Sequence, residues 1–131
     1  MENLQDKVRI LVGVDGSENS RRALVEAVSL AKKFSGHLKA ITVYGRRNEN
    51  KAKEIIEEAK RFFEENKIDY TTSTILGSNP ARALETTAKH ENFDLIIVGS
   101  RGWGSKASIL IGSVSRRVVA NAECNVLVVK K

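Results

Sequence analysis

The sequence predicts an α/β protein built on an open parallel sheet with helices on both faces. Short apolar, β-branched runs alternate with amphipathic segments along almost the whole chain, in the order β-α-β-α-β-α-β-α-β. Strict alternation of strands and helices implies a parallel sheet with right-handed crossovers. The length of 131 residues accommodates one sizeable hydrophobic core. We therefore expect a single domain over residues 1–131.

The first half of the chain is expected to form three strands and two helices. Ser17 is placed to cap the first helix, whose apolar stripe runs to Phe34 before Gly36 ends it. A polar stretch from Gly45 to about Asn50 then leads to a second helix. The strands are expected at Val8–Val14, Leu38–Tyr44 and Tyr70–Leu76, and the apolar helical positions are Leu24, Ala27, Val28, Ala31 and Phe34, followed by Ala52, Ile55, Ile56, Ala59, Phe62 and Phe63.

The polar alternation of Tyr70–Leu76 is typical of an edge strand with one wet face. Asn79 and Pro80 are expected to serve as the cap and the first residue of a third helix. The remaining elements are a strongly hydrophobic strand, a loop rich in glycine and serine, a fourth helix and a last strand. Their predicted ranges are Asp94–Val98, Gly99–Ile111, Gly112–Asn121 and Val126–Val129.

Composition excludes several classes of protein. No apolar run reaches the roughly 20 residues of a membrane helix, so we expect a soluble, cytoplasmic protein without a membrane partner. The lone Cys124, interpreted as an inert small hydrophobe, cannot form an internal disulfide, and with only His37 and His90 beside it a zinc site is not expected. Both histidines are interpreted as surface residues. The net charge of +6 raises nucleic acid as a partner, but 5% aromatic residues and no basic-aromatic strand face argue against it.

Ligands of open parallel sheets bind at the carboxyl ends of the strands, near the point where the strand order reverses. The candidate loops are therefore Asp15–Ser17, Val43–Arg46 and Gly99–Ser113. The last of these lies within Leu95–Ala122, a stretch with basic residues and no acid. We expect an anion to bind there.

Glycines let backbone amides approach phosphate oxygens, and the amides at the start of a helix add the positive end of its dipole. The loop from Gly99 is nevertheless not a Walker P-loop, because Ser105 occupies the position of the required lysine. The segment after the first strand, with Gly13 and Gly16, does not spell a dinucleotide fingerprint either.

The loop does spell G-x2-G-x9-G-[ST], with Gly99, Gly102, Gly112 and Ser113. At average residue usage this pattern arises by chance roughly once in 200 chains of such length. Together with the VDGS segment that ends at Ser17 and the terminal CNVLVV segment, it resembles the ATP-binding branch of the universal stress protein family. The resemblance extends from Val8 to the end of the chain, and it implies the adenine nucleotide alpha hydrolase-like sheet order 3-2-1-4-5.

The resemblance also implies roles for individual residues. Asp15 would contact the nucleoside, the backbone of Val43 would read the adenine edge, and Val98 would line the adenine pocket. The remaining predicted contacts are to ribose and phosphates, from Gly99, Arg101, Gly102, Gly112, Ser113 and Val114.

Each assignment has a plainer alternative. Asp15 could only cap the first helix, and Gly112 could only permit a tight turn into the fourth. Arg101 and Lys106 could be solvated loop charges rather than phosphate contacts, and Trp103 could cover the site or contact a partner.

The favoured function is an ATP-binding regulatory protein of the stress response, with Mg²⁺ or Mn²⁺ beside the nucleotide, an unidentified protein partner and at most slow hydrolysis. A weak ATPase or another phosphoryl-transfer enzyme using the same site is the alternative, but no Walker lysine or pocket histidine supports it. A flavodoxin-like electron carrier shares the element order. The apolar strand Val126–Val129 is expected at a sheet edge without a protecting proline, which together with the resemblance predicts a homodimer through that strand.

Overall fold

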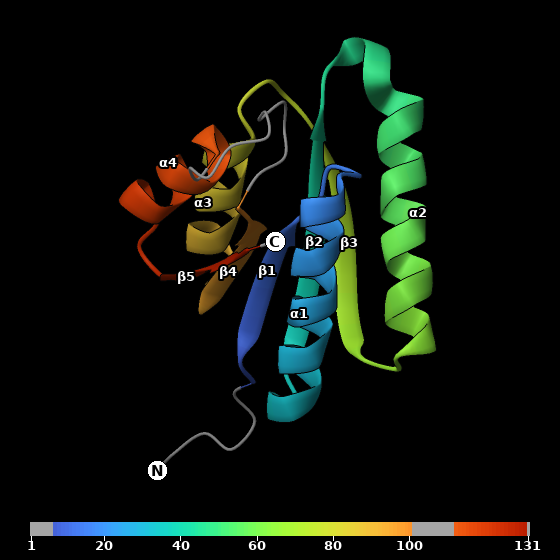
Figure 1. Ribbon diagram of the computed structural model, residues 1–131, viewed down its shortest axis with the longest axis vertical. Coiled ribbons are helices and arrows are strands. Elements are labelled where there is room, and N and C mark those ends of the chain that lie inside the picture. The colour runs from blue at the N-terminus through green and yellow to red at the C-terminus, as the bar shows by residue number, and fades with distance from the viewer. Residues whose placement is uncertain (1–6, 101–111, 131) are drawn as a thin grey trace.

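The computed structural model describes residues 7–100 and 112–130. Their strands form one parallel sheet in the order β3-β2-β1-β4-β5, as the sequence predicts (Figure 1). The chain moves outward from β1 to β3 and then returns to the other side of β1 for β4 and β5, so the order reverses between β1 and β4. The strand bounds are β1 Arg9–Gly13, β2 His37–Tyr44, β3 Asp69–Leu76, β4 Leu95–Gly99 and β5 Asn125–Val129.

Helices cover both faces of the sheet (Figure 1). α1 packs on β1, β4 and β5, and α2 packs beside it on β2 and β3, while α3 and α4 lie together on the opposite face. None of the helices in the described ranges is both long and apolar enough to cross a membrane. The helices are α1 Glu18–Phe34, α2 Glu49–Glu65, α3 Pro80–His90 and α4 Ser113–Asn121, with a single 3-10 turn at Arg46–Asn48.

Two helix starts confirm their predicted caps. The Ser17 side chain accepts a hydrogen bond from the amide of Ser20 at 3.1 Å, and the Asn79 side chain accepts one from the amide of Arg82 at 3.1 Å. Pro80 follows as the first helical residue, where its missing N–H costs no intrahelical bond. Short polar side chains therefore set both helix entries.

Two details differ from the sequence prediction. α2 begins at Glu49, inside the stretch expected to be a linker, because the 3-10 turn leads directly into it without a side-chain cap. Phe34 is 60% exposed although it continues the apolar stripe of α1. It is the last residue of α1, and the chain leaves the helix immediately after it through the left-handed Ser35.

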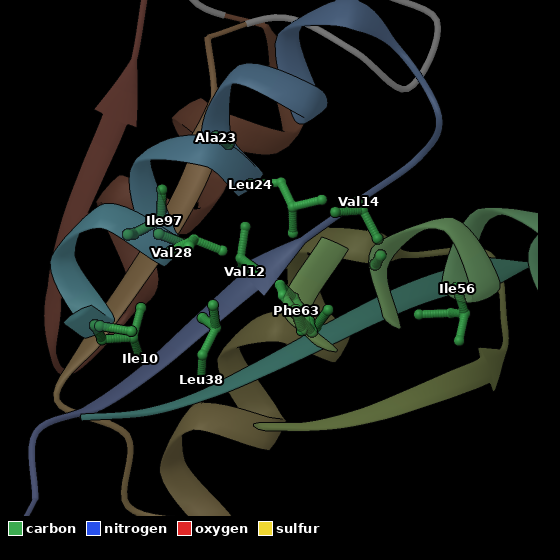
Figure 2. Close-up of a cluster of buried hydrophobic side chains, with 14 residues drawn as sticks. Ile10, Val12, Val14, Ala23, Leu24, Val28, Leu38, Ile56, Phe63 and Ile97 are labelled. Carbon is green, nitrogen blue, oxygen red and sulfur yellow. The ribbon is translucent and has the colours of Figure 1, made fainter. Parts of the chain in front are cut away.

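The core has two parts, one on each face of the sheet. On the α1 and α2 face, Ile10, Val12, Leu38 and Phe63 are completely buried (Figure 2). On the opposite face, Leu11 lies in the second cluster, with the apolar sides of α3 and α4. β1 therefore contributes alternate residues to both cores, which explains its nearly continuous apolar sequence.

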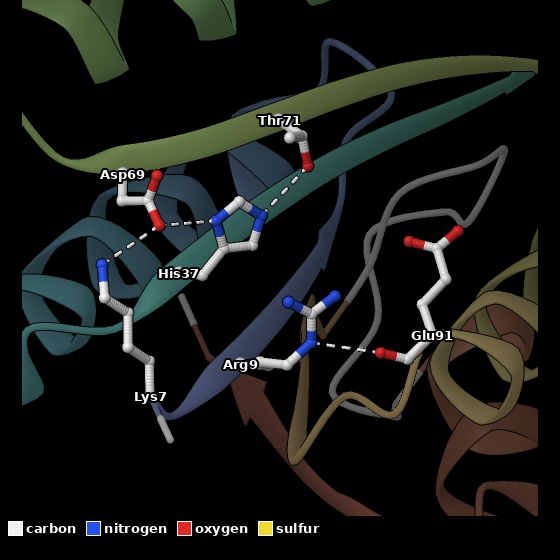
Figure 3. A network of polar contacts seen from close by, with 6 residues as sticks. All are labelled: Lys7, Arg9, His37, Asp69, Thr71 and Glu91. Atoms are coloured by element: carbon white, nitrogen blue, oxygen red, sulfur yellow. Dashed lines mark hydrogen bonds and ion pairs between the residues drawn. The ribbon is translucent and has the colours of Figure 1, made fainter. Parts of the chain in front are cut away.

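A polar network occupies the end of the sheet where the strands begin (Figure 3). His37 Nδ1 lies 2.9 Å from Asp69 Oδ2, and His37 Nε2 lies 3.1 Å from Thr71 Oγ1. Lys7 adds an ion pair to Asp69 at 3.3 Å. The interpretation of His37 as a surface residue is wrong, because its side chain is only 13% exposed and ties β2 to β3.

The close approach of β2 to the start of the chain depends on Gly36. A Cβ there would lie 2.6 Å from the Val8 carbonyl oxygen, which accepts the His37 amide at 2.8 Å. We expect Gly36→Ala to lower the free energy of unfolding by about 1–3 kcal/mol. Gly45→Ala is the control, because a Cβ at Gly45 meets nothing within 4 Å. Urea denaturation of both variants tests this, and equal stability would contradict the steric argument.

The pairing of Asp69 predicts a pH-dependent contribution to stability. The hydrogen bond from His37, and then the nearby Lys7, hold the pKa of the Asp69 carboxyl below its ordinary value in spite of partial desolvation. The stabilisation is therefore present above the unfolded-state pKa and is lost as pH falls through the folded-state pKa, which lies below the ordinary carboxyl range. Because Asp69 is 52% exposed, solvent screening limits the effect to about 0.5 kcal/mol.

Asp69→Asn should accordingly lower the free energy of unfolding near pH 6, and the difference from the parent chain should shrink as pH falls below the ordinary carboxyl range. Glu123→Gln is the control, because its pair with Lys89 is exposed on both sides. Urea denaturation across pH provides the measurement. A difference for Asp69→Asn that stays constant with pH would refute the linkage.

Candidate functional site

The predicted site residues that the structure describes lie at or near the carboxyl ends of β1, β2 and β4, around the reversal of strand order. Asp15 follows β1, Val43 is near the end of β2, and Gly99 ends β4. The topology thus brings together three segments that are far apart in the sequence. Four residues discussed above, Arg101, Gly102, Trp103 and Lys106, lie outside the described residues.

The loop after β1 is held by short hydrogen-bonding side chains. Asp15 Oδ1 accepts the amide of Ser17 at 2.9 Å, and the amide of Asp15 donates to Ser20 Oγ at 3.2 Å. Gly16 between them has a φ of +84°, a left-handed conformation that favours glycine. The residue that caps α1 is Ser17, whereas Asp15 stabilises the turn that leads into the helix. Asp15 is half-buried, at the carboxyl end of β1.

Val43 presents its backbone toward the space beyond β1. Alternate residues of a parallel strand bond to one neighbour, and Ile41 is bonded to β1 because its carbonyl accepts the Val14 amide at 2.9 Å. Two residues further on, the N–H and C=O of Val43 point to the same side, where β1 has already ended at Gly13. Neither group has a partner there among the described residues. A donor and an acceptor therefore stand side by side at the edge, as base recognition requires.

Gly99 has a packing role in addition to the predicted ligand contact. A Cβ at Gly99 would lie 2.6 Å from the carbonyl oxygen of Asn19, so only glycine lets the first turn of α1 approach the end of β4 so closely. The Gly99 carbonyl accepts the hydroxyl of Ser115. Gly99 therefore holds both α1 and α4 against β4. Its neighbour Val98 is completely buried in the core, and its place in the wall of an adenine pocket stays a prediction.

The start of α4 offers backbone donors. Gly112 is its N-cap, with no side-chain cap, and the Gly112 amide is already used by the Ser100 carbonyl at 2.6 Å. The amides of Ser113 and Val114 have no described partner, as expected for the first turn of a helix. Of the three helix-start amides predicted to bind phosphate, two are therefore available, those of Ser113 and Val114. The hydrogen bond from Gly112 to Ser100 fixes the position of the helix start that carries them. The exposed Arg116 and Arg117 keep this turn positive.

Two buried hydroxyls that the sequence analysis missed hold this arrangement together. Ser20 and Ser115 are each only 3% exposed, one bracing the loop after β1 and the other joining α4 to β4. Both occupy apolar-stripe positions of their helices, three residues before Ala23 and Val118. A polar residue at a core position is a signal that could have identified them.

A surface groove between α1 and α2 lies beside this site but contains none of the predicted site residues. It runs from Gly16 along charged side chains of both signs, including Arg21, Lys51, Glu54 and Arg61.

Among the described residues, no group of His, Cys, Asp and Glu side chains could hold a metal ion. Burial raises the pKa of the Cys124 thiol, which disfavours the thiolate and fits its interpretation as an inert residue.

Comparison with known proteins agrees with this fold and motif. The model of the universal stress protein family matches residues 8–130. A universal stress protein of Methanocaldococcus jannaschii is 32% identical, with 99% of this chain and 85% of that protein covered, and one of Bacillus subtilis is 33% identical, with 93% and 98% covered. A solved universal stress protein in complex with cAMP has a TM-score of 0.80 and 30% identity, covering 95% of this chain and 97% of that one. The chain therefore belongs to the universal stress protein family.

Proposed function

We propose that this chain, as one nucleotide-binding domain, binds ATP at the carboxyl edge of its sheet and acts as a nucleotide-dependent switch in the stress response. The observation that carries the proposal is the pairing of Val43, which offers a donor and an acceptor, with the two helix-start amides of Ser113 and Val114. The ends of β2 and β4 flank β1 and are therefore about 10 Å apart. A nucleotide can span that distance with its base at β2 and its phosphates at α4.

The base is proposed to be adenine. Its amino group is a donor beside ring nitrogens that accept, which is the complement of a strand residue's C=O and N–H. Guanine carries a keto oxygen where adenine carries the amino group, and that oxygen would face the Val43 carbonyl. The related protein solved with cAMP also contains an adenine nucleotide.

The phosphates are proposed to lie on the first turn of α4, where the helix dipole and unpaired amides favour an anion. Mg²⁺ or Mn²⁺ would accompany the nucleotide and neutralise part of its charge. Turnover would be slow at most, because phosphoryl transfer needs a positioned base and a lysine or arginine clamp. At this edge the described carboxylate is that of Asp15, and one of its oxygens is already held by Ser17. A weak ATPase remains the alternative use of the same site.

The ligand proposal predicts a selective loss on changing Gly112. Gly112→Val places two methyl groups at the entrance to the α4 amides, and ATP binding with Mg²⁺ should fall at least tenfold, or about 1.4 kcal/mol. Ala120→Val is the control, because it introduces the same side chain on the exposed side of α4. Isothermal titration calorimetry gives the affinities, with GTP expected to bind more weakly than ATP. A parent chain that takes up no ATP at millimolar concentration would sink the proposal.

We also propose a homodimer through β5, which lies at the sheet edge. Val129 is bonded to β4, since its carbonyl accepts the Ser100 amide at 2.9 Å, so the backbone groups of Val126 and Val128 point outward. Antiparallel pairing with the same strand of a second copy would satisfy them. The apolar, half-buried side chains of the strand would then be covered further.

Val128→Pro should lower the mass measured by sedimentation, because it removes an outward N–H without touching the ladder to β4. Val128→Thr retains both the amide and the β-branched shape, and it should sediment like the parent chain. Far-ultraviolet circular dichroism checks that both variants are folded. Equal masses for all three proteins would exclude β5 as the interface.

A further inference from the structure

We propose that the opposite edge of the sheet, the strand β3 together with the outer side of α2, is a second two-fold interface that binds another copy of this chain. The inference concerns neither the nucleotide site nor β5, and it holds whether or not they behave as proposed above. It rests on the backbone of β3, on the lack of charge along this strand after its first residue, Asp69, and on the order of charges along α2.

The backbone of β3 has an unpaired side. Gly77 donates its amide to the Tyr44 carbonyl at 2.9 Å, which fixes the odd-numbered residues of β3 as those that bond to β2. The N–H and C=O groups of Tyr70, Thr72, Thr74 and Leu76 therefore point away from the sheet. Among the described residues, none of these outward groups has a backbone partner.

Edge strands are normally protected by charge, proline or a bulge. β3 has none of these along its outer side, since no charged residue occurs between Tyr70 and Ala81, and the single proline of the chain lies beyond the strand at Pro80. Leu76 is 57% exposed. This is a long, regular and uncharged edge, suited to pairing with another strand.

β3 is complementary to itself in the antiparallel direction. A two-fold axis at Ser73 places Tyr70 opposite Leu76 and Thr72 opposite Thr74 of the second copy. All are outward residues, so each pair exchanges two backbone hydrogen bonds and no outward group of the four is left over. The side-chain pairs are one aromatic with one aliphatic and two threonines, both favourable across strands.

α2 carries a charge pattern that fits the same axis. Lys53, Glu57, Lys60 and Glu64 recur at spacings of four, three and four residues and form one stripe along the helix. Glu64 at the end of the stripe lies toward β3, because the Tyr70 hydroxyl donates to it at 2.7 Å, whereas Glu58, outside the stripe, pairs with Arg21 of α1 at 3.6 Å. At the other end, Lys53 and Glu57 also line the groove that begins at Gly16 and Arg21. Figure 1 shows α2 running beside β3 at this end of the sheet.

An alternating stripe is complementary to its own reverse. In an antiparallel copy, Lys53 faces Glu64 and Glu57 faces Lys60, so every contact joins opposite charges. The side chains are exposed, with Lys53 66% exposed, Glu57 56% and Lys60 38%. Within the helix Lys53 pairs with Glu49 at 3.7 Å and Lys60 with Glu57 at 3.5 Å, and exposed pairs of this kind are weak enough to exchange for contacts with a second copy.

The pairing of β3 and the pairing of the α2 stripe place the two-fold axis at the same position along the direction of β3. Tyr70 OH donates to Glu64 Oε2 at 2.7 Å, which aligns the start of β3 with the end of α2. From Tyr70 to Ser73 is about 10 Å along the strand, and from Glu64 to the midpoint of the stripe is about 8 Å along the helix. Because α2 packs over both β2 and β3, the α2 helices of two paired copies would lie about 10 Å apart, a normal distance for packed helices.

The first test is a disulfide across the axis. In a Cys124→Ala background, Ser73→Cys places two thiols at a close, non-hydrogen-bonded pair, within the reach of a disulfide. Thr71→Cys is the matched control, on the same strand and face but about 13 Å from its own copy in this register. Under mild oxidation of the full chain, Ser73→Cys should form covalent dimers at least tenfold faster than Thr71→Cys. Denaturing gels detect only covalent dimers, so β5 pairing does not interfere, and equal rates or no cross-linking at all would overturn the proposal.

The second test is a charge swap, measured by sedimentation in a Val128→Pro background that lacks the β5 edge. Lys60→Glu should weaken association about fivefold at low salt, because it sets like charges against each other in both symmetric contacts. The double variant Glu57→Lys with Lys60→Glu again sets opposite charges against each other at positions 57 and 60 across the axis, and it should return association to within about twofold of the background. Failure of the double variant to recover would show that the α2 stripe does not lie in the interface.

Discussion

The architecture depends on β1, the strand that is bonded on both sides and buried on both faces. Ile10, Leu11 and Val12 are fully buried, and the backbone of β1 pairs with β2 and with β4. Because β1 stops at Gly13 while β2 continues to Tyr44, a short length of β2 has no neighbour on its inner side. The candidate site occupies that gap. A longer first strand would pair with Val43 and remove the donor and acceptor on which the proposed base recognition depends.

Local patterns in the sequence were sufficient to predict the elements, their order and two of the caps, because each depends on nearby residues. Ser17 accepts the amide of Ser20, only three residues away, and Pro80 fixes a first turn by its own ring. The start of α2 escaped prediction because no side chain caps it. His37 escaped because its partners Asp69 and Thr71 lie on another strand, more than 30 residues away in the sequence.

The site could be predicted in part. The motif located the glycines, but it could not show that Gly99 also accommodates the Asn19 carbonyl, or that the Gly112 amide is used by Ser100. Both facts arise from packing between segments that are distant in the sequence. A glycine selected for close packing and one selected for ligand contact look identical in a pattern of letters, and only their neighbours distinguish them.

A nucleotide switch requires a structural link between the ligand and a surface that a partner can read. A ligand shifts an equilibrium only by the difference in its affinity for the two states. Here the link would be Ser100, whose amide donates to Val129 of β5 and whose carbonyl accepts the amide of Gly112, the cap of α4. An anion held, as proposed, by the first turn of α4 would therefore act two hydrogen bonds away from the β5 edge. β3 lies at the other end of the sheet, beyond β2, and within residues 7–100 and 112–130 no comparable connection joins it to α4. If both edges bind copies of the chain, the nucleotide can influence the β5 contact while leaving the β3 contact unchanged.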